Sequence, residues 1–149
     1  MPTVHYNALV DSESTRVWQL IRKFGGISQW HPAIAHSVIE DDRPESLVGC
    51  VRRLTLEDGT ILLERLMAVD DRQMSLAYRF ERALLPVDNY LMKIKLIPLS
   101  AEHRTVIQWS ASFDNRELDP QGRQASAIRE LIVVGHDSLQ AYLKSQPSA

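Results

Sequence analysis

The strongest constraint on the fold is an apolar pattern near the C-terminal end of the chain. Between Pro120 and Ser145, apolar or small residues recur at steps of four, three, four and three positions. They are Ile128, Ile132, Gly135, Leu139 and Tyr142, with Leu131 beside them. This spacing predicts one helix of about seven turns that buries a single face. Asp119, directly before Pro120, is typical of a helix start.

Gly135 lies in the middle of this buried face. A glycine inside a helix costs about 1 kcal/mol relative to alanine. Such a small residue allows close approach of another segment, or it leaves open space beneath the helix. The second of these interpretations predicts a cavity under the long helix.

In most of the remaining chain the apolar residues recur at every second position, which is typical of strands. Alternation over Thr3–Val10 predicts a strand, and two short helices follow between Asp11 and Trp30. Six further stretches with a period of two predict strands. They are Ile34–Glu40, Val48–Leu56, Thr60–Val69, Met74–Phe80, Asp88–Ile97 and Thr105–Phe113. Short connections such as Asp58-Gly59 indicate hairpins, so the strands are expected to run antiparallel.

This order of elements predicts one α+β domain over residues 1–149. A curved antiparallel sheet of about seven strands needs a cover on one face. The long C-terminal helix is the only predicted element large enough to supply it. A sheet wrapped around one helix leaves space between the two, and that space is the natural ligand site.

The composition of the chain limits the kinds of molecule that it is expected to bind. The net charge of −2 and the pI near 6.2 argue against a nucleic-acid surface. The sequence contains no run of 18 apolar residues, so no membrane span is expected. Met1–Val10 lacks the features of a signal peptide. The single cysteine, Cys50, excludes an internal disulfide framework and predicts a reducing, cytoplasmic compartment. Either a monomer or a homodimer is expected. The five histidines show no metal-ligand spacing and no phosphate-binding loop is present, so we expect neither metal nor cofactor.

The element order, with Val17-Trp18 and Trp30-His31-Pro32, resembles the START-like (SRPBCC) superfamily, in particular its bacterial polyketide cyclase/dehydrase-like branch. The segments Val48–Cys50, Glu64–Leu66 and Asn89-Tyr90 are more distantly similar to the plant abscisic acid receptors. The resemblance implies a helix-grip fold with an internal apolar cavity. Members of this superfamily include receptors, lipid carriers and cyclases, so the fold does not fix the function.

The same resemblance implies polar groups inside the cavity. It places Glu64 and Tyr90 at cavity positions, and Arg52, Leu54 and Leu56 on the inward face of a strand. Since a lone buried charge is costly, Arg52 is the expected partner of Glu64. The other interpretation puts Glu64 on the solvated face of its strand. Arg52, Glu64 and Tyr90 are also the candidates for any catalysis.

The remaining candidates are apolar wall positions and the cavity mouth. The wall is expected to include Leu66, Tyr78, Met92, Trp109, Ala111, Phe113, Ile132, Gly135 and Leu139, and the mouth Trp30 and His31. For the aromatic residues the alternative is ordinary core packing, and for His31 it is a solvated loop position. His136, near the edge of the helical stripe, is expected to be structural.

The sequence therefore predicts binding of a small apolar molecule, such as a lipid, a polyketide or an aromatic compound. The first alternative is a cyclase or dehydratase that uses the same cavity for polyketide-like substrates. The second is a regulatory or assembly protein with a vestigial cavity.

Overall fold

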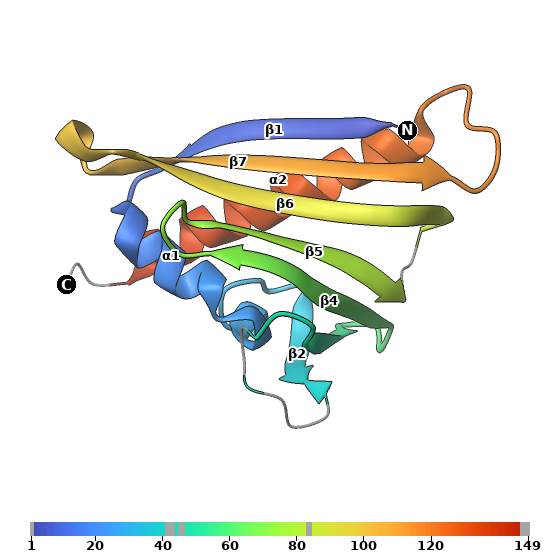
Figure 1. Cartoon of the computed structure of the whole chain (residues 1–149), viewed down its shortest axis with the longest axis horizontal. Helices are drawn as coiled ribbons and strands as arrows, with labels where there is room; N and C mark the ends of the chain where they lie inside the picture. Colours follow the sequence, from blue (N-terminus) through green and yellow to red (C-terminus); the bar gives the residue numbers. More distant parts are fainter. Residues whose placement is uncertain (1, 41–43, 45–46, 83–84, 147–149) are drawn as a thin grey trace.

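The structure is a computed structural model that describes residues 2–40, 44, 47–82 and 85–146. The described chain forms a strand, two short helices and six more strands, with a third short helix between the last two strands, and then a long helix (Figure 1). The helices are α1 (Ser14–Arg22), η1 (Phe24–Gln29), η3 (Ser100–Glu102) and α2 (Arg123–Ser145). The strands are β1 (Thr3–Val10), β2 (Ile34–Ile39), β3 (Val51–Leu56), β4 (Ile61–Asp70), β5 (Ser75–Arg82), β6 (Val87–Leu99) and β7 (Arg104–Asn115).

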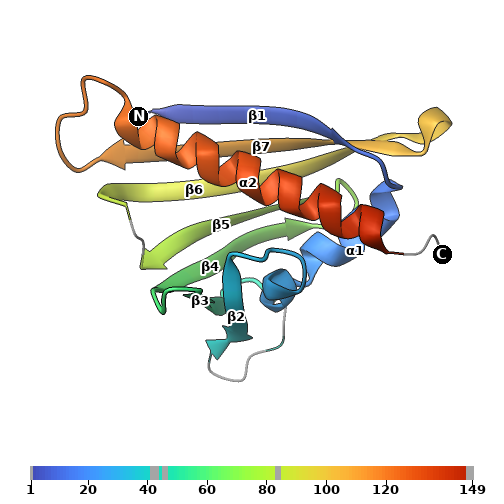
Figure 2. The ribbon, with the colours of Figure 1, turned by 180° about the vertical axis from the view of Figure 1, so that it is seen from behind.

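The seven strands form one antiparallel sheet in the order β1-β7-β6-β5-β4-β3-β2. Helices α1 and η1 carry the chain from β1 at one edge to β2 at the other. Helix α2 lies across the concave face, over β1, β7 and β6, while β3 to β5 curve away from it (Figure 2). The predicted α+β helix-grip fold is confirmed.

Curvature in the sheet has a local origin in irregular pairing. The register between β4 and β5 shifts once between Leu63 and Glu64 and again between Leu66 and Ala68. Extra residues of this kind bend a strand and increase its twist. The bends let the sheet curve around α2. The pairing of β3 with β4 is regular and places Glu64 opposite Arg52.

Helix α2 begins later than its sequence pattern predicts. It starts at Arg123 after Gly122, whose φ of 65° lies in the left-handed region that glycine adopts most easily. Asp119 still satisfies the helix start, because its carboxylate accepts hydrogen bonds from the backbone N–H of Arg123 at 2.9 Å and of Gln124 at 2.8 Å. Pro120 therefore lies in the preceding turn and not in the first helical turn.

The buried face of α2 is rotated slightly from the predicted one. Ile128, Ile132, Gly135 and Leu139 are buried as expected, and so is Leu143. Leu131 is 51% exposed. Tyr142 is only partly buried, and its hydroxyl accepts a hydrogen bond from Gln29. These corrections arise because the helix crosses the sheet obliquely, so its contact face drifts along its length.

Candidate functional site

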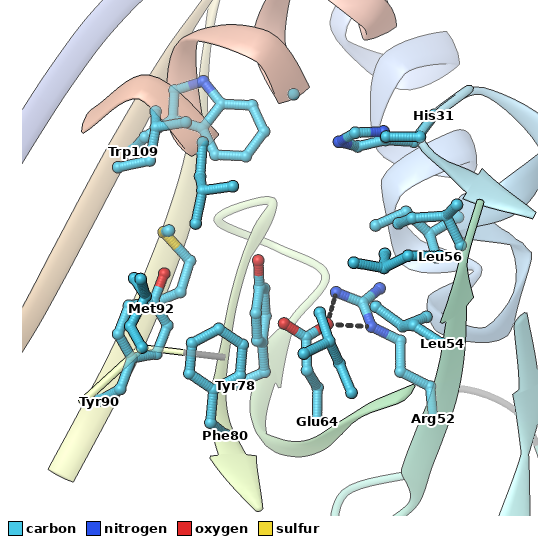
Figure 3. Close-up of a pocket in the computed structure, with 18 of the residues that line it drawn as sticks. His31, Arg52, Leu54, Leu56, Glu64, Tyr78, Phe80, Tyr90, Met92 and Trp109 are labelled. Carbon is cyan, nitrogen blue, oxygen red and sulfur yellow. Dashed lines mark hydrogen bonds and ion pairs between the residues drawn. The ribbon is translucent and has the colours of Figure 1, made fainter. Parts of the chain in front are cut away.

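A cavity of about 180 Å³ lies between α2 and the middle of the sheet (Figure 3). It is lined by most of the residues that the sequence placed there: Trp30, His31, Arg52, Leu54, Leu56, Glu64, Tyr78, Tyr90, Met92, Trp109, Ile132 and Gly135. They come from the segment after η1, from β3 to β7 and from α2. The apolar walls and the few polar groups together are typical of a small-molecule site.

Four predicted wall residues lie elsewhere. Leu66, Ala111, Phe113 and Leu139 are at most 1% exposed and belong to the solid core. Alternation along a strand identifies the inward face, but that face supplies both core and cavity. Which of the two a residue joins depends on where α2 crosses, and no local pattern encodes this.

Several wall residues were missed by the sequence prediction: Ile27, Ala33, Ile34, Leu62, Phe80, Leu85 and Leu131. A signal existed for two of them. Leu62 shares the face of Glu64 on β4, and Phe80 shares the face of Tyr78 on β5. The Phe80 ring stacks on the Tyr90 ring with a centroid distance of 4.1 Å, so it forms part of the cavity floor.

The polar centre of the cavity is an ion pair between Arg52 and Glu64. Arg52 Nε donates to Glu64 Oε1 at 2.8 Å, and Nη2 lies 2.7 Å from the same oxygen. The side chains are only 5% and 6% exposed. The inward orientation of Glu64 is therefore confirmed, as is its pairing with Arg52.

Arg52 is held by three further groups. Its Nη1 donates to the carbonyl of Phe24 at 3.0 Å. Its Cζ lies 4.0 Å from the centroid of the Phe24 ring and 4.7 Å from that of Tyr78. Aromatic faces attract a guanidinium, most strongly where water is excluded. The cation is thus held by both polar and aromatic contacts before any ligand arrives.

Tyr78 and Tyr90 add two hydroxyl groups to the wall. Figure 3 shows both hydroxyls pointing into the cavity. Burial, followed by the charge of Glu64, raises the pKa of Tyr78, and burial also raises the pKa of Tyr90. Both phenols therefore stay protonated at neutral pH and act as uncharged hydrogen-bonding groups.

His31 closes the side of the cavity that faces α2. A Cβ atom added at Gly135 would lie 3.8 Å from His31 Nε2, an ordinary contact distance, so the imidazole packs directly against the backbone of α2 at this position. His31 Nδ1 is buried and has no hydrogen-bond partner among the described residues. Burial, with a smaller effect of Arg52, lowers the pKa of His31. The ring is therefore neutral at pH 7.

His136 does not lie in the wall but holds a wall residue in place. Trp109 Nε1 donates to His136 Nδ1 at 3.2 Å, and His136 Nε2 lies 3.1 Å from the carbonyl of Leu9. Because indole is only a donor, Nδ1 must accept and Nε2 must carry the proton. The neutral tautomer therefore links α2, β7 and β1, as expected for a structural histidine.

These two histidines predict that stability falls in mild acid. Burial lowers the pKa of His136, as it does for His31, so the folded protein binds a proton at each ring more weakly than the unfolded chain does. Their contribution is complete above the unfolded pKa of about 6.5 and is lost progressively as the pH falls below it. We expect the free energy of unfolding in urea to be lower at pH 5.5 than at pH 7.5.

The matched variant is His136→Gln, which keeps a polar side chain but cannot titrate. Its urea midpoint should change less between pH 7.5 and pH 5.5 than that of the natural protein. An identical pH dependence in the two proteins would show that His136 does not carry the effect.

Other kinds of site have little support in the structure. No group of three or more His, Cys, Asp or Glu residues in the described part of the chain could hold a metal ion. No described helix is long and apolar enough to cross a bilayer.

Comparison with known sequences places the chain in a family. The sequence model of the family described as polyketide cyclase / dehydrase and lipid transport matches residues 1–144. The chain belongs to this family. The match confirms the resemblance to the START-like superfamily. No curated protein sequence matches the chain significantly.

Several solved structures share the fold of this chain. An uncharacterized protein from Bacillus thuringiensis is 24% identical, with 95% of this chain and 99% of that one covered and a TM-score of 0.84. The protein XoxI from Bacillus cereus is 26% identical, with 96% of each chain covered and a TM-score of 0.82. Norcoclaurine synthase from Thalictrum flavum, solved with dopamine and hydroxybenzaldehyde, is 16% identical over 99% of this chain and 89% of that one, with a TM-score of 0.74.

Proposed function

We propose that this protein binds a small, mainly apolar molecule in the cavity between α2 and the sheet. The observation that carries the proposal is the combination of apolar walls with a buried, fully formed Arg52–Glu64 pair. A cavity of about 180 Å³ removes favourable packing from its lining unless something fills it. The family description, which includes lipid transport, supports a binding role.

The polar groups of the cavity wall are suited to orienting a ligand. Burial raises the pKa of Tyr78 and of Tyr90 and lowers the pKa of His31, so all three are neutral near pH 7. Neutral phenols and a neutral imidazole orient a ligand through hydrogen bonds. Binding of an oriented ligand is thus the function that the described groups support best.

Gly135 provides the test, because its position faces the cavity and its backbone is an ordinary helix. A methyl group there meets its nearest neighbour, His31 Nε2, at an ordinary contact distance of 3.8 Å. Gly135→Ala should therefore fold, gain up to about 1 kcal/mol of stability from helix propensity and still bind. Gly135→Leu should fold but fill the cavity, and binding should weaken by about tenfold or more.

The measurement is calorimetric titration of the natural protein and both variants with 4-ethylphenol and with ethylbenzene, two single-ring compounds. Equal binding by the natural protein and Gly135→Leu would place the bound compound outside the cavity. If neither compound binds to the natural protein, the proposed function is contradicted.

A further inference from the structure

The Glu64 carboxylate presents its two oxygens to different partners. Both contacts from Arg52 reach Oε1. Within the described part of the chain, Oε2 accepts no hydrogen bond, and Figure 3 shows the second oxygen directed away from Arg52 into the cavity. A carboxylate oxygen can only accept hydrogen bonds. This position therefore calls for a ligand that donates one.

Arg52 is a poor anchor for an acidic ligand. Three of its five N–H groups already donate or pair, two to Glu64 and one to the Phe24 carbonyl. The aromatic rings of Phe24 and Tyr78 lie against the guanidinium. A ligand carboxylate that reached the remaining N–H groups would lie beside the Glu64 carboxylate, whose like charge opposes it.

The charges around the cavity also balance. Among the described residues of the wall, Arg52 and Glu64 are the two that carry full charges, and His31 is neutral. A cationic or anionic ligand would therefore bring an uncompensated charge into an apolar space, which is unfavourable. An uncharged ligand avoids this and can still form a charge-assisted hydrogen bond to Oε2.

The volume sets the size of the ligand. A cavity of about 150 Å³ in another protein is large enough to bind benzene. The cavity described above is only slightly larger, at about 180 Å³. It suits one ring with substituents, or two rings at most.

We propose that the cavity selects a compact, uncharged molecule of one or two rings that donates a hydroxyl hydrogen bond to Glu64 Oε2. This inference rests on the proposed binding function and adds the chemical class of the ligand. In this arrangement the ligand hydroxyl donates to Glu64 Oε2, and the ligand ring packs against Leu54 and Met92. The hydroxyls of Tyr78 and Tyr90 form hydrogen bonds with any second polar group of the ligand.

The first experiment compares three compounds of matched size by calorimetry at pH 7.5: 4-ethylphenol, ethylbenzene and 4-ethylbenzoate. 4-Ethylphenol is an uncharged donor, ethylbenzene has no donor, and 4-ethylbenzoate is an anion. The natural protein should bind 4-ethylphenol about tenfold or more tightly than either of the others, since a hydrogen bond to a charged group supplies a factor of that order. Equal or tighter binding of ethylbenzene or 4-ethylbenzoate would overturn the inference.

The second experiment changes the acceptor. Glu64→Gln removes the carboxylate and leaves Arg52 without its counter-charge. The affinity for 4-ethylbenzoate relative to that for 4-ethylphenol should therefore rise by about tenfold or more. Glu81→Gln is the matched control, because Glu81 pairs with Arg65 and Arg79 away from the cavity. It should leave all three affinities unchanged. An unchanged preference in Glu64→Gln would contradict the role of Glu64.

The size limit has its own measurement. In an unrestricted apolar site each added CH₂ group strengthens binding by about fourfold. In this cavity 4-heptylphenol should bind no more tightly than 4-ethylphenol. A continuous gain in affinity with chain length would overturn the size limit.

If Glu64→Gln does not fold, the affinity ratios measured on the natural protein still decide the inference. Failure of all compounds to bind contradicts the proposed function instead.

Discussion

Ile132→Asp is expected to unfold the domain. Ile132 is 2% exposed on the buried face of α2, next to the cavity. The substitution removes a large apolar side chain, worth about 2–5 kcal/mol when truncated, and places an unpaired carboxylate beneath the helix. Domains of this size are stable by only about 5–15 kcal/mol, so the combined loss approaches the whole.

A neighbouring position on the same helix supplies the control. Val134 is also β-branched but 44% exposed, so Val134→Asp should change the melting temperature by only a few degrees. Circular dichroism melts of both variants would measure the difference. A melt of Ile132→Asp close to that of the natural protein would mean that α2 does not pack on the sheet through this face.

Separating the Arg52–Glu64 pair is expected to be the second-largest perturbation. Both side chains are almost fully buried, and each neutralises the other. Arg52→Met or Glu64→Leu alone leaves one charge without a partner, which costs about 3–5 kcal/mol. The double variant removes both charges together, so its loss should be much smaller than the sum of the single losses.

Urea denaturation of the two single variants and the double variant forms a complete cycle. Arg79→Met is the control, because Arg79 pairs with Glu81 at 2.8 Å but is 48% exposed, and surface pairs contribute at most about 1 kcal/mol. Additive losses in the Arg52–Glu64 cycle would show that the two residues act independently, contrary to the geometry.

Much of the fold was predictable because alternation is a local property. The inward residues of β6 and β7, from Tyr90 to Leu96 and from Thr105 to Phe113, follow from a period of two. The pairing of Arg52 with Glu64 was also predictable, since a charge on an inward face needs a partner. The pairing of β1 with β7 is different, because it joins segments about a hundred residues apart and no turn specifies it.

The detailed cavity wall could not be predicted, since it depends on how α2 crosses the sheet. Phe113 and Trp109 lie on the same face of β7, yet only Trp109 reaches the cavity. Leu131 was expected beside the buried stripe, but it is half-exposed at the rim. The contact between His31 and Gly135 joins two distant segments whose sequences contain no common signal.

A methyl NMR titration of the natural protein with 4-ethylphenol tests binding in the cavity most directly. We expect the chemical-shift changes to concentrate on wall residues of the cavity, in particular Leu54, Met92 and Ile132. The core methyls of Ile107 and Ile128, which are 0% exposed and do not line the cavity, should shift least. Shifts confined to surface methyls such as Leu118, or no shifts at a saturating concentration, would contradict binding in the cavity.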